Sequence, residues 1–139
     1  MNHHTVTAVF PAPKERVFDY LAAVENLPRW ATDFARELKR VDGEWKVVNG
    51  LGEFVFRIEA DPKTGVIDML AGPTRDALSL FPTRVVPLDE TSSAFTFTMF
   101  QAPGQADEIF EAQYRSLLRE LANLEREFAT EAGNGTVRP

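Results

Sequence analysis

The chain carries few side chains whose types and spacing could perform catalysis. Its only histidines, His3 and His4, are adjacent, and neighbours on a strand point to opposite faces, so they cannot readily chelate one metal ion. A zinc site needs three or four ligands, so we expect no metal and interpret both histidines as surface residues without a function. No serine has a histidine nearby to activate it. None of the glycine-rich nucleotide-binding motifs occurs, so we expect no cofactor.

Four polar residues, Arg75, Arg84, Gln113 and Tyr114, are candidates for lining a cavity. Each is also readily explained by a structural role. If the chain is an enzyme, Tyr114, Arg84 and Asp76 are the residues that could aid proton transfer. None of the three belongs to a recognisable catalytic motif, so the sequence leaves open whether a reaction is catalysed.

Apolar residues make a firmer group of candidates, because a ligand pocket is mostly apolar with few polar groups. Met69 and Met99 would supply adaptable walls, and we expect Ile58 and Leu121 to face inward beside them. The residues expected to bind a ligand are Trp30, Phe34, Phe54, Phe56, Met69, Leu78, Leu80, Arg84, Phe97, Met99, Gln113, Tyr114 and Leu117. The same apolar residues could instead form a filled core, and the size of the void between them decides.

The stretch FPAPKERVFDYLAAVENLPRWA, residues 10–31, indicates how Trp30 is positioned. Pro13 suits the first turn of an amphipathic helix, where the missing N–H costs nothing. Asn26 is a plausible N-cap for a second, very short helix with Pro28 in its first turn. Trp30 then either caps the end of the core or forms the wall or mouth of a pocket, since an indole has an apolar body and a polar N–H.

Most of the chain follows the two-residue period of strands. Residues 4–10 alternate in this way, and residues 34–101 continue with several short strands separated by turn residues. Residues 52–60 form the clearest strand, and we expect the sixth strand over 76–86. Pro82 inside that strand predicts a bulge or an edge. Short turns between successive strands predict an antiparallel meander.

A long helix is predicted over residues 104–129. Its apolar stripe consists of Phe110, Tyr114, Leu117, Leu121, Leu124 and Phe128. This heptad-like spacing could serve a coiled coil, but the sheet needs a cover and no other helix is long enough. Glu108 and Glu111 suit the positive end of the helix dipole. We expect one domain over residues 1–129 and a loose tail over 130–139, which lacks an apolar face.

Composition narrows the classes of partner. The 139 residues include 44% hydrophobic residues, 11 Phe and no Cys, and the net charge is -6. Nucleic acids require clusters of Lys and Arg, so we expect no nucleic-acid partner. No apolar run approaches the ~20 residues that span a bilayer, and no signal peptide is evident. A cytoplasmic location is the default expectation, and the oligomeric state is open.

The order of elements resembles the helix-grip fold of the SRPBCC superfamily, which includes birch-pollen-allergen-like proteins, START domains and polyketide cyclase/dehydrase-like proteins. The resemblance rests on APKERVFDYLAAVENLPRW, residues 12–30, and on the helix EIFEAQYRSLLRELANLERE. It implies an α+β fold in which a curved antiparallel sheet of about seven strands wraps around the C-terminal helix. Two short helices follow the first strand, and a cavity remains between sheet and helix.

Function is less specific than fold in this superfamily. The resemblance implies a small hydrophobic or aromatic ligand, such as a lipid, polyketide or isoprenoid-like molecule, held in the cavity. The alternatives are a polyketide cyclase or dehydratase-like enzyme acting in the same cavity, and a protein-interaction module without a ligand.

Overall fold

A single antiparallel sheet organises the chain. The computed structural model describes the backbone of residues 1–136 and the side chains of residues 1–129. The strands are β1 (His3–Phe10), β2 (Glu37–Val41), β3 (Glu44–Asn49), β4 (Gly52–Asp61), β5 (Val66–Gly72), β6 (Ser79–Pro87) and β7 (Ser93–Phe100). Their order across the sheet is β1-β7-β6-β5-β4-β3-β2. Strands β2 to β7 therefore form the expected meander. Strand β1 pairs with β7 and is one edge of the sheet.

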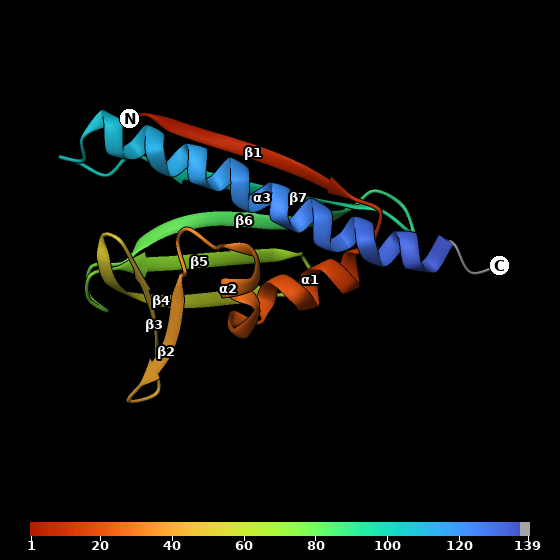
Figure 1. Cartoon of the computed structure of the whole chain (residues 1–139), viewed down its shortest axis with the longest axis horizontal. Coiled ribbons are helices and arrows are strands. Elements are labelled where there is room, and N and C mark those ends of the chain that lie inside the picture. Colours follow the sequence, from red (N-terminus) through yellow and green to blue (C-terminus); the bar gives the residue numbers. More distant parts are fainter. Residues whose placement is uncertain (137–139) are drawn as a thin grey trace.

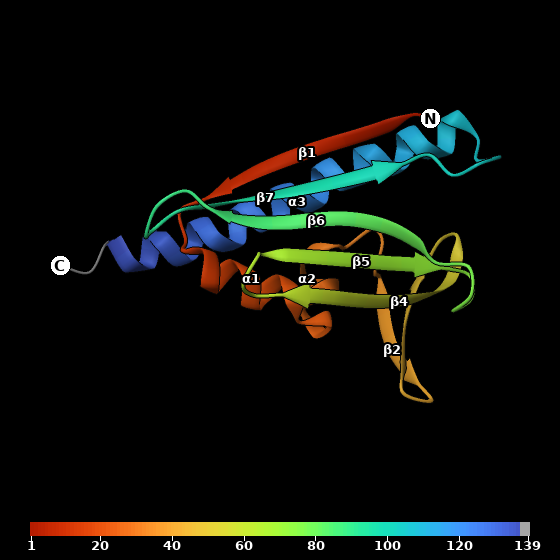
Figure 2. The ribbon, with the colours of Figure 1, turned by 180° about the vertical axis from the view of Figure 1, so that it is seen from behind.

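The helices lie on one side of this curved sheet (Figure 1). They are α1 (Lys14–Ala22), the 3-10 turn η1 (Val24–Asn26), α2 (Leu27–Trp30) and α3 (Asp107–Thr136). The long helix α3 runs beside β1, and α1 and α2 pack near its C-terminal half (Figures 1 and 2). This arrangement confirms the expected α+β architecture. No helix in the described part of the chain is both long and apolar enough to span a membrane.

Prolines lie at the start of both short helices, and an asparagine fixes the turn between them. Pro13 is the N-cap of α1 in an extended conformation, and Pro28 lies in the first turn of α2. Asn26 occupies the N-cap position of α2 as expected, but its side chain does not cap that helix. Its Nδ2 instead donates to the carbonyl oxygen of Tyr20 at 3.0 Å. The asparagine therefore fixes the turn between α1 and α2.

The apolar stripe of α3 packs on the sheet and on α1. Its buried members are Phe110, Leu117, Leu121, Leu124 and Phe128. The ring of Phe128 lies 4.9 Å from that of Phe10 on β1 and 5.4 Å from that of Tyr20 on α1. These contacts show that the stripe covers the core, as the sheet-cover interpretation required.

The ends of α3 differ from those expected. The helix begins at Asp107, after Gly104 has reversed the chain with φ +80°. It continues to Thr136, through most of the stretch expected to be a tail, because extending an existing helix adds a hydrogen bond without a new nucleation cost. Residues 137–139 lie outside the described residues.

Pro82 lies where β6 is locally an edge. It is opposite Asp68 of β5, but the pairing of β6 with β7 begins only at Thr83. The first residues of β6 therefore have a partner strand on one side, where a residue without an N–H is tolerated. Figure 2 shows β6 curving away from β7 at this end. The predicted edge at Pro82 is therefore confirmed for this end of β6, where the strand pairs with β5 alone.

Candidate functional site

A group of apolar side chains from the sheet, from the loop before β2 and from α3 lies between sheet and helix but is not fully buried. We call it the inner-face cluster, and it comprises Phe34, Leu38, Phe54, Ile58, Phe81, Phe97 and Tyr114. Each packs against the core while keeping part of its surface accessible. Covering large apolar groups with a further apolar partner is favourable, because it removes apolar surface from water. The cluster is therefore the part of the inner face that could bind an apolar molecule.

Strand register places the cluster in one continuous surface. Met69 of β5 lies opposite Ile58 of β4 on one side and opposite Phe81 of β6 on the other. The rings of Phe81 and Phe97 are 6.0 Å apart, which extends the surface to β7. Because side chains alternate between the two faces of a strand, these residues share the inner face.

Most of the predicted ligand-binding residues face inward, in two classes of exposure. Trp30, Phe56, Met69, Met99 and Leu117 are buried, whereas Phe34, Phe54, Phe97, Gln113 and Tyr114 are partly exposed. Trp30 is 3% exposed, and its ring meets that of Phe95 edge-on with 6.3 Å between the centroids. Of the two interpretations of Trp30, this exposure favours the core cap.

Two predictions on β6 are wrong in orientation. Leu80 is 46% exposed and lies on the outer face. Arg84 is exposed as well, and its Nε donates to the carbonyl oxygen of Thr64 at 3.0 Å. The strand places Phe81 and Val85 inward, so the even-numbered residues point outward. Leu78 precedes the strand and is half-buried, because β6 starts later than the sequence pattern predicts.

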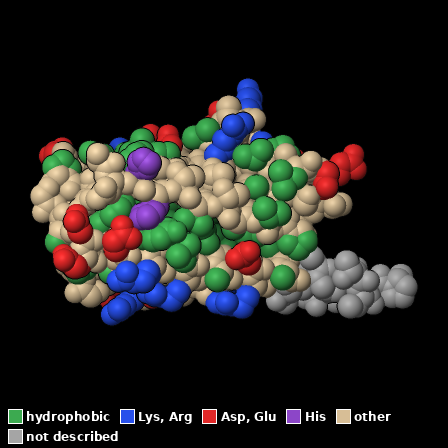
Figure 3. All heavy atoms as spheres, turned by 90° about the horizontal axis from the view of Figure 1, so that it is seen from above, with side chains coloured by type: hydrophobic (Ala, Val, Ile, Leu, Met, Phe, Trp, Pro, Cys, Tyr) green, Lys and Arg blue, Asp and Glu red, His purple; other side chains and the backbone are tan. Residues whose placement is uncertain are grey.

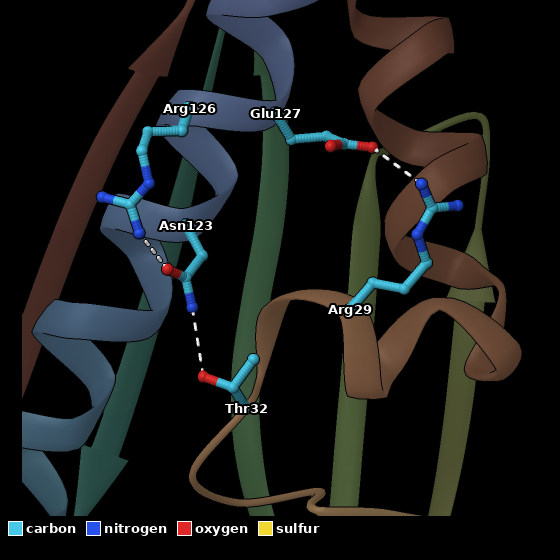
Figure 4. Close-up of a pocket in the computed structure, with 5 residues that line it drawn as sticks. All are labelled: Arg29, Thr32, Asn123, Arg126 and Glu127. Atoms are coloured by element: carbon cyan, nitrogen blue, oxygen red, sulfur yellow. Dashed lines mark hydrogen bonds and ion pairs between the residues drawn. The ribbon is translucent and has the colours of Figure 1, made fainter.

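Two hollows on the described surface lie away from the inner-face cluster. One has a volume of about 360 Å³ and lies between α2 and α3 (Figure 4). It is lined by Arg29, Thr32, Asn123, Arg126 and Glu127. The other is lined by Lys14, Glu15, Pro87, Leu88, Asp89 and Glu90. None of the predicted ligand-binding residues lines either hollow.

Polar side chains cross the first hollow and tie α2 to α3. Nδ2 of Asn123 donates to the Trp30 carbonyl oxygen at 2.9 Å and to Oγ1 of Thr32 at 3.2 Å. Arg29 forms an ion pair with Glu127 at 3.2 Å. Figure 4 shows the Asn123–Thr32 and Arg29–Glu127 contacts between the α2 segment and α3. These contacts hold the end of α2 against the long helix.

Glu120 continues this polar seam as a buried carboxyl group. It is 5% exposed, and its Oε2 accepts hydrogen bonds from the backbone N–H groups of Asp33 at 3.2 Å and Phe34 at 3.0 Å. Burial raises the pKa of Glu120 to about 7; the hydrogen bond from Phe34 lowers it, and the charge of Asp33 raises it further. No sequence pattern indicates this residue beyond its place beside the apolar stripe.

His4 is a second residue that sequence reasoning missed. Its Nε2 is 3.1 Å from Oε1 of Glu111, and its ring stacks on Tyr114 with the centroids 3.6 Å apart. Phe110 stacks on the same imidazole at 5.4 Å. In Figure 3 the histidine side chains lie beside a group of hydrophobic ones. His4 is thus a half-buried part of the β1–α3 contact rather than a free surface residue.

Comparison with known proteins gives a strong result for structure and a weak one for sequence. No protein-family model matches the chain. A stretch of 100 residues is 24% identical to part of zinc finger FYVE domain-containing protein 26 from Homo sapiens, and the chain spans only 4% of that protein's length. The XoxI protein from Bacillus cereus superimposes with a TM-score of 0.73 and 17% identity, over 93% of this chain and 96% of XoxI.

Two further solved structures share the fold of this chain. The Zhui aromatase/cyclase from Streptomyces sp. R1128 superimposes with a TM-score of 0.73 and 19% identity, over 94% of this chain and 95% of that one. A START superfamily protein from Mycobacterium smegmatis gives 0.63 and 15%, over 92% and 97%. The chain has the helix-grip fold. The helix-grip assignment rests on the whole chain, because the superpositions span nearly all of it.

Proposed function

We propose that this helix-grip protein binds a small hydrophobic or aromatic molecule between the inner face of its sheet and α3. The observation that carries the proposal is the inner-face cluster, whose apolar side chains pack against the core and yet remain partly exposed. A bound apolar molecule would cover these groups, at roughly 25 cal/mol per Å² of apolar surface removed from water.

The structural neighbours support this class of ligand. One is an aromatase/cyclase and another is a START superfamily protein. The phenylalanines of the cluster suit a flat or aromatic ligand, because offset and edge-to-face ring contacts add to simple area burial. A lipid, a polyketide or an isoprenoid-like molecule fits these requirements.

A pair of adjacent residues on β6 tests the proposal. Phe81 belongs to the inner-face cluster, whereas Leu80 is exposed on the outer face. Titration with 1-anilinonaphthalene-8-sulfonate should give saturable binding that Phe81→Ala weakens and Leu80→Ala leaves unchanged. Phe81→Leu, which retains more of the apolar volume, guards against a folding defect. Equal binding by both alanine variants, or no saturable binding by the parent protein, would contradict a ligand site on the inner face.

An enzyme of the cyclase type is a second candidate, favoured by the contact of His4 with Glu111 and Tyr114. An imidazole beside a carboxylate is a common means of moving a proton. Asp76 and Arg84 no longer support this candidate, because both are exposed and outside the cluster. Incubation with a reactive poly-β-carbonyl compound should then produce an aromatic product faster than in buffer, and His4→Gln should slow that reaction without weakening binding.

A further inference from the structure

The segment between α2 and β2, residues 31–36, bridges α3 and the sheet through one residue. The backbone N–H of Phe34 donates to Glu120 on α3 at 3.0 Å, and its carbonyl oxygen accepts from Nδ2 of Asn49 at the end of β3 at 2.8 Å. Its ring meets Phe56 of β4 edge-on at 5.8 Å. Phe34 therefore closes the side of the inner-face cluster between the long helix and the sheet.

The rest of the segment is held mainly from α3. Asp33 donates its N–H to Glu120 at 3.2 Å, and its Oδ2 accepts from Arg119 at 2.7 Å. The segment is short and folded on itself, with the N–H of Ala35 donating to the carbonyl oxygen of Ala31 at 2.7 Å. It makes no strand pairs of its own, since β2 begins at Glu37. The segment is therefore held by polar contacts to α3 and by the burial of Ala31 and Ala35 in the core.

We propose that residues 31–36 form a pH-sensitive strap beside the ligand site, closed while Glu120 carries a proton and opening when that proton is lost. The strap buries Glu120, which is 5% exposed. A buried carboxylate is unfavourable unless its charge is compensated, so ionisation favours the conformation in which water reaches the group. Opening also frees Phe34 and exposes the edge of the inner-face cluster.

The charges around Glu120 support this direction. Burial raises the pKa of Glu120 most, and the hydrogen bond from the N–H of Phe34 lowers it. The charge of Asp33 raises the pKa, and the hydrogen bond from the N–H of Asp33 and the charge of Arg119 each lower it by less. Asp33 itself stays ionised, because the hydrogen bond from Arg119, followed by Ser116 and the charge of Arg36, lowers its pKa. The partner on β3 is the neutral Asn49. Burial is the largest effect, and it raises the pKa of Glu120 from 4.5 to about 7.

The direction of the pH effect follows by linkage. The closed strap holds Glu120 with the raised pKa, and the open strap returns it to its ordinary value. The closed form is therefore favoured at low pH, and this preference is lost as the pH rises through 7. With these values the opening equilibrium should increase roughly 70-fold between pH 5 and pH 8.5.

Amide hydrogen exchange tests the strap without any ligand. The amides of Asp33 and Phe34 should be less protected than those of the central strand β5. Such a difference would indicate that the strap opens locally while the sheet stays folded. Their protection factors should fall by roughly 70-fold between pH 5 and pH 8.5. Glu120→Gln should abolish this step, and Glu125→Gln, on the exposed side of α3, should retain it. Protection independent of pH, or equal to that of β5, would overturn the proposal.

The link to ligand entry rests on the proposed function and has a separate measurement. The association rate of 1-anilinonaphthalene-8-sulfonate should rise with pH in the parent protein and in Glu125→Gln but stay constant in Glu120→Gln. A dye that binds at a rate unrelated to strap exchange would overturn the role of the strap in entry. A dye that fails to bind at any pH would overturn the proposed function, and the exchange data would still decide whether the strap opens.

Discussion

The imidazole of His4 lies parallel to the ring of Tyr114, with 3.6 Å between the centroids and 6° between the planes. One ring comes from the first strand and the other from the first half of α3. Glu111 approaches the same imidazole at 3.1 Å. This contact fastens the edge strand β1 to the helix, near the start of both elements.

Replacing His4 by alanine should therefore lower the free energy of unfolding by about 1 kcal/mol, the magnitude of an aromatic pair with part of its area exposed. Glu111→Gln should cost less than half of this, because the glutamine amide can still form a hydrogen bond with the imidazole. Urea denaturation of both variants checks the order. A larger effect at Glu111 would show that charge, rather than stacking, holds β1 to α3.

The apolar stripe of α3 gives a second prediction. Leu121 is 2% exposed, whereas Leu118, one turn earlier at the edge of the apolar stripe, is 41% exposed. Leu121→Ala should destabilise the protein by roughly 2–5 kcal/mol, and Leu118→Ala by less than about 1 kcal/mol. Thermal unfolding of the two variants separates these outcomes. Similar midpoints would mean that the stripe is not the covering face.

Glu120 should make stability depend on pH. Its folded-state pKa of about 7 is above the ordinary 4.5, so its stabilising contribution is complete below pH 4.5 and is lost as the pH rises through 7. Between pH 5.5 and pH 8.5 the parent protein should lose about 2 kcal/mol that Glu120→Gln does not lose. Urea titrations at both pH values give this difference. If the free energy of unfolding changed equally with pH in the parent protein and in Glu120→Gln, the Glu120 carboxyl would be in contact with water in the folded state.

Two glycines with nearly the same backbone conformation differ in their surroundings. Gly65 has φ +80°, and a Cβ there would overlap the backbone carbonyl of Val85; Gly43 has φ +78°, and a Cβ there meets no atom within 4 Å. Gly43→Ala should cost about 1–2 kcal/mol for the left-handed conformation alone. Gly65→Ala should cost clearly more, because β6 must shift as well. Equal midpoints in denaturant would show that the β4–β5 turn can relax around the methyl group.

The sequence predicts most of the fold because its two periods are clear. The strand residues around Phe54 and Phe56 alternate strictly, and the stripe of α3 keeps helical spacing. The orientation of Leu80 was predicted wrongly because the two-residue period does not show which set of alternate residues on β6 faces inward. Apolar residues on both sides of Pro82 permit either face, and only the pairing with β5 and β7 decides between them.

The polar contacts could not be predicted for a different reason. Glu120 and His4 each gain their role from a partner more than 80 residues away, as the separations of 87 and 107 residues to Asp33 and Glu111 show. Neither partner is indicated by a local pattern. A charged residue beside an apolar stripe is usually solvated, and only the return of the chain over α3 makes Glu120 a buried group.

The pairing of β1 with β7 has a consequence for synthesis on the ribosome. Thr5 and Thr98 face each other across these strands although they are 93 positions apart in sequence. At a translation rate of about 5–20 residues per second, β1 would emerge several seconds before its partner strand. The hairpins from β2 to β7 can pair as they leave the exit tunnel, whereas β1 has to wait as an unpaired apolar strand. A nascent chain stalled before β7 should therefore hold β1 in a form that chaperones bind and proteases cleave.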